Sequence, residues 1–339
     1  MDDPFDVIQD ANMPFLKGAL NPHRVGLFLG RMLQSNTALN ATVSLQRIQV
    51  LRHKAGRRCL IEYVVDLKKP SGEGETITLL GKARARGLDR TTYRICGALW
   101  NCGFDETSPD HVSVPQTMGT IPEFEMWFQR KTSGGSSAQL LMQTATTGLP
   151  KRIAEAIHKV HKVNLSTRRS HSMADELRIL HERLPLVAEM NPDWTPRLER
   201  ILAACDHLGA TVPIPQPTGI HRDFYLDHVL IDGDRLYLID FDLFCMGDPA
   251  LDIGNFLAHL IEQSIRAFGD AEALQEQGEV LREHYLRLAG KKFQTNVEAY
   301  TILSLVRHIH ISTLFPNRRP FTQRLLSLCE QRLGLAASY

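Results

Sequence analysis

The sequence lacks the features that mark several common classes of protein. Its six cysteines are scattered with no C-x-x-C spacing, so the chain carries neither a zinc ribbon nor a thioredoxin-like redox motif. The formal net charge is only +1, which gives no electrostatic bias toward nucleic acid or a membrane surface. These absences favour a reduced, cytoplasmic protein that binds neither nucleic acid nor a membrane.

Long apolar runs are missing as well. Residues 1–20 begin acidic and have neither the basic start nor the apolar stretch of a signal peptide, and no window approaches the length of a membrane span. The 339 residues are 43% hydrophobic and 23% charged, which is typical of a globular protein with enough chain for two lobes and two cores.

Residues 1–130 are predicted to form a lobe around an antiparallel sheet. A helical pattern over about residues 5–35 gives way, between residues 42 and 87, to alternation with a period of two. A short helix over residues 89–103 and two strand-like runs, 111–119 and 122–130, follow. One strand of this sheet would place five side chains on a single face, namely Cys59, Ile61, Tyr63, Val65 and Leu67.

The segment "RKTSGGSS" is the most linker-like passage of the chain, so we expect a hinge at residues 131–137. Residues 138–339 are predicted to form a mostly helical lobe, because apolar residues recur at i, i+3 and i+4 in many of its segments. The predicted helices cover residues 150–165, 172–190, 194–208, 250–267, 271–289, 295–315 and 320–334.

One aspartate-rich stretch, "HRDFYLDHVLIDGDRLYLIDFDLFCMGDPALD", interrupts this helical pattern. Two apolar runs flank the turn "DGD" and predict a hairpin, which would bring Asp223 near Asp240 although seventeen positions separate them. Two converging carboxylates suit magnesium, which is usually held by one or two carboxylates together with substrate phosphates. The alternative is that these aspartates only cap surface turns.

The motifs in this stretch resemble those of the protein-kinase-like superfamily, in its aminoglycoside phosphotransferase and choline kinase branch. "HRDFYLDH" is similar to the H-x-D-x-x-x-x-N catalytic loop, "IDFD" to the counterpart of D-F-G, and "GDPALD" to the G-D-P-x-x-D that follows. The resemblance covers most of residues 40–310. It implies an α+β, two-lobed fold with a small antiparallel-sheet N-lobe and a larger, mostly helical C-lobe.

The resemblance also implies roles for individual residues. Asp223 would be the catalytic base that takes a proton from the substrate hydroxyl, and Asp240 would bind Mg²⁺. Lys82 would steady the phosphates of ATP, while His221 and Asp252 would support the catalytic loop. The implied cofactors are ATP and magnesium, and the implied partner is a small molecule with a hydroxyl acceptor.

The sequence departs from the family pattern at the second metal ligand. His228 stands where the family has asparagine, and imidazole is a softer and less typical magnesium ligand than an amide oxygen. We therefore expect His228 to be a metal ligand of unusual type or a histidine of purely structural function.

The nucleotide-binding lobe departs from the pattern too. The loop "RHKAGRRC", expected to cover the phosphates, has a single glycine, Gly56, and guanidinium contacts from Arg57 would compensate for the missing backbone amides. The helix that follows the sheet offers no glutamate to pair with Lys82, only Asp89 at its start.

Three functions are compatible with these patterns. The first is an ATP- and magnesium-dependent phosphotransferase that acts on an aminoglycoside, a sugar or an amino-alcohol. The second is a pseudokinase-like scaffold that binds a nucleotide or a partner, suggested by His228 and the glycine-poor loop. A protein kinase is disfavoured, because no A-P-E segment follows "IDFD". The acids of "MADELRILHERL" or "LCEQRLG" could form a pocket for a cationic acceptor, and the sequence does not indicate the oligomeric state.

Overall fold

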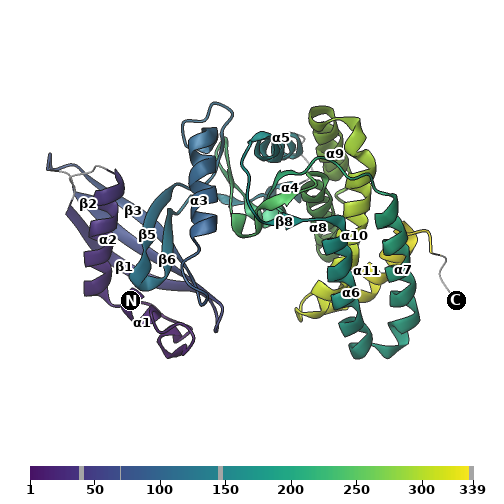
Figure 1. Ribbon diagram of the computed structural model, residues 1–339, viewed down its shortest axis with the longest axis horizontal. Helices are drawn as coiled ribbons and strands as arrows, with labels where there is room; N and C mark the ends of the chain where they lie inside the picture. Colours follow the sequence, from purple (N-terminus) through teal and green to yellow (C-terminus); the bar gives the residue numbers. More distant parts are fainter. Residues whose placement is uncertain (38–41, 69, 144–147, 336–339) are drawn as a thin grey trace. The chain divides into compact units, whose positions relative to one another are not determined.

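The computed structural model describes residues 1–37, 42–68, 70–143 and 148–335 (Figure 1). The chain divides into two compact units, Met1–Ser133 and Gly134–Tyr339, and the division falls inside residues 131–137. The first unit is built on an antiparallel sheet and the second mainly on helices, which confirms the predicted α+β class. No helix within the described ranges is both long and apolar enough to span a membrane.

The sheet of the first unit has the strand order β1-β2-β3-β6-β5, with antiparallel neighbours throughout. The five side chains from Cys59 to Leu67 that were predicted to share a face are all buried, since alternate residues of a strand point to the same side. The strands of this unit are β1 (Thr42–Lys54), β2 (Arg58–Lys68), β3 (Gly74–Arg84), β4 (Val112–Ser113), β5 (Thr117–Ile121) and β6 (Met126–Arg130).

The helical pattern expected over about residues 5–35 is present, but it is divided into separate elements. The segment forms a 3₁₀ turn at Val7–Gln9 and two helices, α1 (Leu16–Ala19) and α2 (Pro22–Thr37). Pro22 explains the break between them, because proline disfavours helical backbone in the residue before it and has no N–H to donate. The amide of Arg24 donates to the Asn21 side chain instead, which starts α2 as an N-cap does.

The predicted helix at residues 89–103 is confirmed in its position. Helix α3 (Arg90–Leu99) begins at Asp89, whose carboxylate accepts a hydrogen bond from the Thr92 amide, and continues as one π turn, Trp100–Phe104. Ile95 and Leu99 are buried, as the apolar spacing requires.

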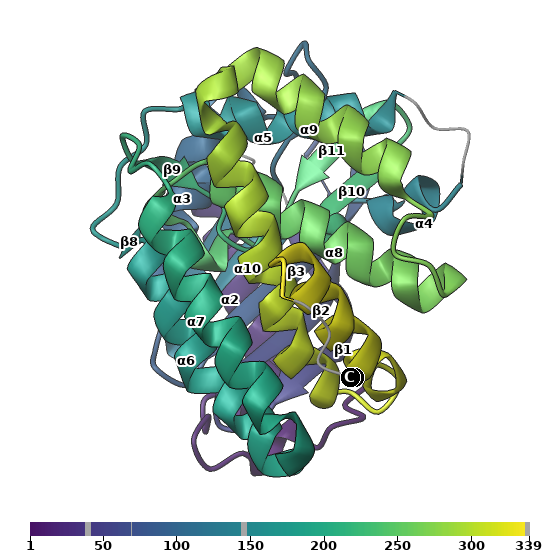
Figure 2. The same ribbon diagram turned by 90° about the vertical axis from the view of Figure 1, so that its right-hand side faces the viewer.

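Every helix predicted for the second lobe is present in the second unit (Figures 1 and 2). A short additional helix, α4, follows directly after the glycine- and serine-rich stretch. The helices of this unit are α4 (Ser137–Leu141), α5 (Leu149–Lys162), α6 (Met173–Met190), α7 (Thr195–Thr211), α8 (Ala250–Phe268), α9 (Gln275–Ala289), α10 (Gln294–Thr313) and α11 (Thr322–Arg332).

Helices α8 and α10 form the centre of the second unit and lie side by side (Figure 2). Gly254 lets them approach closely, because a Cβ at this position would lie 2.5 Å from Tyr300 Cβ and 2.7 Å from the Thr301 amide nitrogen. The close packing fixes α8, and with it the side chains that α8 directs at the aspartate-rich stretch.

The predicted hairpin is present as β10 (Val229–Asp232) and β11 (Arg235–Leu238), with Asp232 paired to Arg235 across the turn. Strand β7 (Gly135–Ser136) pairs with β10, so this part of the linker-like segment is an ordered strand. Residue 134 is a glycine because a Cβ at this position would overlap the carbonyl of Ile231.

A second small sheet, not predicted from the sequence, has the order β8-β12-β9. Its strands are β8 (Ser170–His171), β9 (Thr218–Ile220) and β12 (Cys245–Gly247). Since β9 ends at the residue before His221, this sheet fixes the point at which the aspartate-rich stretch begins.

Candidate active site

Asp252 holds the backbone of the predicted catalytic loop. Its carboxylate, fully buried near the start of α8, accepts hydrogen bonds from the amides of His221 at 2.9 Å and Arg222 at 2.6 Å. A third contact, at 2.8 Å, comes from His161 Nε2 on α5. Three hydrogen-bond donors satisfy this buried carboxylate. Asp252 therefore holds the loop backbone in place from helix α8.

His221 connects the same loop to the residue that follows the second strand of the hairpin. Its Nε2 donates to the carbonyl of Ile239 at 2.8 Å, and the amide of Ile239 donates to the carbonyl of His228 at 3.1 Å. Ile239 therefore connects the start and the end of the loop, and the next residue along the chain is Asp240. This arrangement supports the structural role that the sequence predicted for His221.

The loop brings Asp223 and Asp240 to the same imidazole. His228 Nδ1 lies 3.8 Å from Asp223 Oδ2, and His228 Nε2 lies 3.6 Å from Asp240 Oδ2. Burial lowers the pKa of His228, as does the neighbouring His221, although the two carboxylates oppose that effect. The convergence of the two aspartates predicted from the hairpin is confirmed by these distances, whereas their chemical roles remain predictions.

Aromatic rings pack against the His228 imidazole and against one another. The Tyr225 ring centroid lies 4.2 Å from that of His228 and 4.4 Å from that of His259 on α8, with which it stacks. His259 in turn meets His308 of α10 at 4.3 Å, edge to face. The packing leaves the His228 side chain only 9% exposed and restricts its rotamer.

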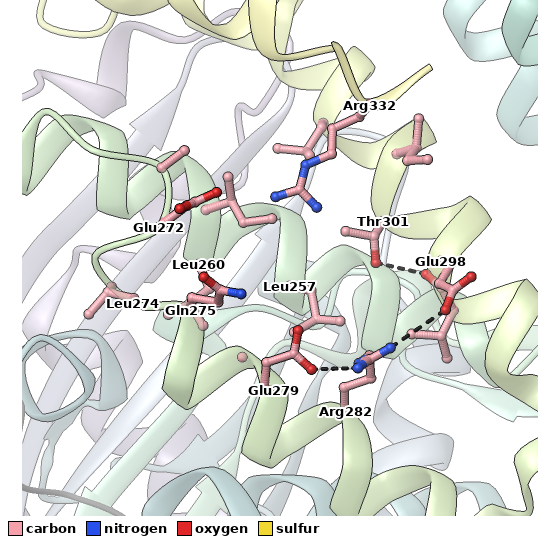
Figure 3. A pocket seen from close by; sticks show the side chains of 16 residues that line it. Leu257, Leu260, Glu272, Leu274, Gln275, Glu279, Arg282, Glu298, Thr301 and Arg332 are labelled. Atoms are coloured by element: carbon pink, nitrogen blue, oxygen red, sulfur yellow. Dashed lines mark hydrogen bonds and ion pairs between the residues drawn. The ribbon is translucent and has the colours of Figure 1, made fainter. Parts of the chain in front are cut away.

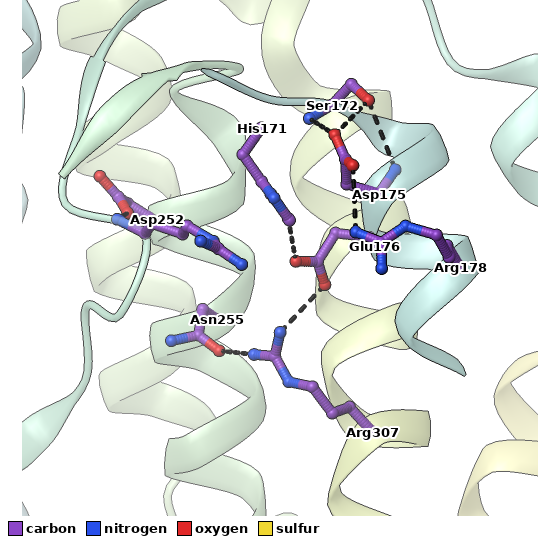
Figure 4. A network of polar contacts seen from close by, with 9 residues as sticks. His171, Ser172, Asp175, Glu176, Arg178, Asp252, Asn255 and Arg307 are labelled. Carbon is purple, nitrogen blue, oxygen red and sulfur yellow. Dashed lines mark hydrogen bonds and ion pairs between the residues drawn. The ribbon is translucent and has the colours of Figure 1, made fainter. Parts of the chain in front are cut away.

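A second polar network reaches the loop from three helices (Figure 4). Glu176 of α6 lies 2.6 Å from His171 Nε2 and accepts from Arg307 of α10 at 3.0 Å. Arg307 also donates to Asn255 of α8, whose amide group donates to the carbonyl of Phe224 at 3.0 Å. Burial raises the pKa of Glu176, but Arg307 and His171 together lower it below its usual value.

The sequence patterns did not connect these network residues with the loop. No motif singles out His161, yet it contacts Asp252 and lies 3.0 Å from the Tyr285 hydroxyl. Glu176, Asn255 and Arg307 lie far apart in the sequence, so no local spacing connects them. Their only sequence signal is that each is a polar residue on the apolar side of a helix.

Two residues of the loop have backbone angles that are unusual for side-chain-bearing residues. Arg222 has φ +70° and Asp240 has φ +64°, both in the left-handed region. Such conformations cost on the order of 1 kcal/mol or more and are kept where surrounding contacts enforce them. Arg222 directly precedes Asp223, and the second strained residue is Asp240 itself, so both strained positions lie at the two proposed site carboxylates.

Lys82 lies in β3, paired across the sheet with Trp127 of β6. Its Nζ lies 5.0 Å from the centroid of the Trp127 ring, a cation–π distance. Gly81 and Ala83 on either side of it are buried, so Lys82 projects from the opposite face of the sheet. Asp89, the acid considered as its partner, caps α3 and pairs with Arg84 at 3.1 Å.

Gly56 and Arg57 form the turn between β1 and β2. The amide of Gly56 donates to the Asp10 carboxylate at 2.7 Å, and that of Arg57 donates to the carbonyl of Lys54 at 2.9 Å. Both amides are thus used within the first unit. A phosphate contact by this turn would consequently depend on the Arg57 guanidinium, as the glycine-poor sequence suggested.

The candidate metal donors are Asp240 and His228. Within the residues that the structure describes, no set of three or more His, Cys, Asp or Glu side chains is arranged to hold a metal ion. If Asp240 and His228 bind a metal ion, its other ligands would have to be groups such as phosphate oxygens and water.

Two pockets of the second unit lie elsewhere. One, of about 290 Å³, is formed by α8, α9, α10 and α11, and its rim includes Arg282, Glu279 and Glu298 (Figure 3). Another, of about 640 Å³, is mainly apolar and reaches Asp248. None of the predicted site residues lines either pocket, so neither is part of the carboxylate cluster.

Comparisons with known proteins agree with this geometry. The family model described as the phosphotransferase enzyme family matches residues 107–290, which is more than half of the chain. No curated protein matches the chain.

Solved structures share the fold at low sequence identity. A choline/ethanolamine kinase family protein from Mesorhizobium loti is 15% identical, with a TM-score of 0.56 over 94% of this chain and 93% of that one. Plasmodium vivax ethanolamine kinase is 14% identical, with a TM-score of 0.54 over 91% and 89%. An aminoglycoside phosphotransferase bound to AMP-PNP and hygromycin B is 15% identical, with a TM-score of 0.55 over 92% and 99%. These likenesses confirm the protein-kinase-like fold.

Proposed function

Because the chain belongs to the phosphotransferase enzyme family, we propose that it is a small-molecule kinase that transfers the γ-phosphoryl group of ATP to a hydroxyl. The observation that carries this proposal is the pair of carboxylates, Asp223 and Asp240, held within 4 Å of His228 on a loop that Asp252 braces.

Asp223 is the proposed base. Its side chain is 43% exposed, so a substrate hydroxyl can reach it, while the loop backbone around it is fixed by Asp252 and Asn255. As the hydroxyl oxygen bonds to the γ-phosphorus and the bond to the β-phosphate oxygen breaks, the hydroxyl proton passes to the Asp223 carboxylate. Orientation of the hydroxyl is the main contribution of this residue.

Asp240 and His228 are the proposed metal ligands, and Lys82 and Arg57 the proposed phosphate contacts. A bound divalent metal would neutralise charge on the phosphates of the nucleotide. The assignments of Lys82 and Arg57 rest on the family pattern, supported by the position of Lys82 on β3 and by the exposed turn that carries Arg57.

The acceptor is proposed to be a small hydroxyl compound such as an aminoglycoside, a sugar or an amino-alcohol. Structural neighbours are named as choline, ethanolamine and aminoglycoside kinases. The acids considered as a pocket for a cationic acceptor are each paired with arginine. Glu176 pairs with Arg307, and Glu330 pairs with Arg197. These acids do not favour a cationic acceptor over a neutral one.

Substitution of the base tests the proposal. In Asp223→Asn we expect phosphoryl transfer from ATP to a panel of hydroxyl compounds to fall by about 10²–10⁴-fold, since the amide cannot accept the proton. Binding of ATP should be nearly unchanged. The matched control is Asp234→Asn in the exposed hairpin turn, which should leave the transfer rate unchanged.

The alternative is a pseudokinase-like scaffold, which His228 favours because it replaces the expected asparagine. If the wild-type protein binds ATP with metal but transfers phosphate to no acceptor, the scaffold is supported. If Asp223→Asn transfers phosphate as fast as the wild-type protein, the assignment of the base is wrong.

A further inference from the structure

The two ring nitrogens of His228 have different environments. Nδ1 lies 2.6 Å from the backbone carbonyl oxygen of Asp223. A carbonyl oxygen only accepts hydrogen bonds, so Nδ1 must carry the proton and donate it. In the neutral ring the lone pair is then on Nε2, the nitrogen that faces Asp240. The backbone of the proposed catalytic residue thereby selects the tautomer.

His228 Nε2 and Asp240 Oδ2 are placed as two ligands of one ion. Their separation of 3.6 Å is longer than a hydrogen bond. Two donors that are each about 2.1 Å from a common ion are separated by about 3.0 Å at a right angle and about 4.2 Å in line. The observed distance lies between these limits, so both groups can bind the same ion without rearrangement of the loop.

The surroundings hold both donors in place. The amide of His228 donates to the carbonyl of Tyr225 at 2.9 Å, and the carbonyl of His228 accepts from the amide of Ile239. The Tyr225 ring packs against the imidazole. Metal-binding histidines usually donate their other ring N–H to a carbonyl or carboxylate, and the bond from Nδ1 to Asp223 has this arrangement.

We propose that His228 and Asp240 form a mixed nitrogen–oxygen site that selects a transition-metal dication of the Mn²⁺ class over Mg²⁺. Magnesium is the harder ion and prefers oxygen ligands, whereas imidazole nitrogen suits first-row transition metals. Mn²⁺ also accepts the carboxylate and phosphate oxygens that complete the site. The proposal rests on the proposed function, because the nucleotide supplies the remaining ligands.

Pulsed electron paramagnetic resonance of the wild-type protein with Mn²⁺ and ATP tests the nitrogen ligand directly. We expect a ¹⁴N coupling that changes to ¹⁵N in protein labelled at histidine and that disappears in His228→Asn. The matched control is His207→Asn, an exposed histidine of α7, which should keep the coupling. Thermal unfolding of each variant checks that it is folded.

Calorimetric titration of ATP in Mn²⁺ and in Mg²⁺ tests the selectivity. We expect the wild-type protein to bind ATP more tightly with Mn²⁺ than with Mg²⁺. In His228→Asn this preference should fall by on the order of tenfold. If the preference is the same in both proteins and no ¹⁴N coupling is seen, the inference is overturned and the kinase proposal stands. If ATP binds with neither metal, both are overturned.

Discussion

At the scale of single residues, the site depends on the buried carboxylate of Asp252. Asp252 accepts from two consecutive backbone amides, those of His221 and Arg222, and contacts His161. The unusual backbone angle of Arg222 lies at this contact, so the energy of the hydrogen bonds offsets the strain in the loop. The side chain therefore contributes both to stability and to the position of Asp223.

Replacing this carboxylate should destabilise the second unit. In Asp252→Asn one oxygen acceptor is replaced by a side-chain N–H₂, which faces either the Arg222 amide or the His221 amide together with His161. We expect the free energy of unfolding to fall by about 1.5–3 kcal/mol, measured by chemical denaturation. Asp206→Asn, which removes a half-exposed carboxylate paired with His181, is the control and should change stability by less than about 0.5 kcal/mol. Equal stability of the two variants would contradict the bracing role.

The motifs predicted some of these residues and could not predict others. Asp223, Asp240 and Asp252 stand in one short stretch with a recognisable order, and the structure places all three around the loop. Glu176 and Arg307 support the same loop from α6 and α10, but 131 positions separate them. Their contact exists only because α6 and α10 pack together. The spacing of residues along the chain cannot predict such packing.

At the scale of secondary-structure elements, α8 is the framework of the site. Asp252, Asn255 and His259 all contact residues 221–228 from it, and α8 also packs on α10. The close approach of the two helices at Gly254 leaves no room for a side chain.

Gly254→Ala should therefore destabilise the protein although alanine is the better helix former. The added methyl would overlap the backbone of α10, so we expect a loss of about 1–3 kcal/mol in the free energy of unfolding. Gly30→Ala in α2 is the matched control, because nothing lies within 4 Å of a Cβ at that position. We expect this control to be neutral or to gain up to about 1 kcal/mol from helix propensity. A stabilised Gly254→Ala would show that α8 and α10 are not packed as described.

Periodicity predicted the elements that are long or flanked by clear turns. The helices from α5 to α11 have long amphipathic patterns, and the β10–β11 hairpin has the turn residues Asp232, Gly233 and Asp234. Strands β8, β9 and β12 are two or three residues long, so they carry no measurable period. The N-terminal periodicity did not show where the helices are divided, because it continued through Pro14 and Pro22, which end helices locally.

At the scale of the whole molecule, we propose that ATP affinity depends on two residues that lie far apart in the sequence, Lys82 and Asp240. The proposed role of Lys82 is a charge-assisted contact with phosphate, which is typically worth about 1.5–3 kcal/mol. Loss of either residue should therefore weaken ATP binding at least about tenfold.

The most direct test is calorimetric titration of ATP, once with divalent metal and once with EDTA. It compares the wild-type protein with Lys82→Ala, Asp240→Asn and the surface control Lys17→Ala. The account predicts metal-dependent binding that is retained in the control and weakened at least about tenfold in both site variants. The proposal is contradicted if the wild-type protein does not bind ATP, if it binds ATP equally with metal and with EDTA, or if Asp240→Asn binds ATP as tightly as the wild-type protein.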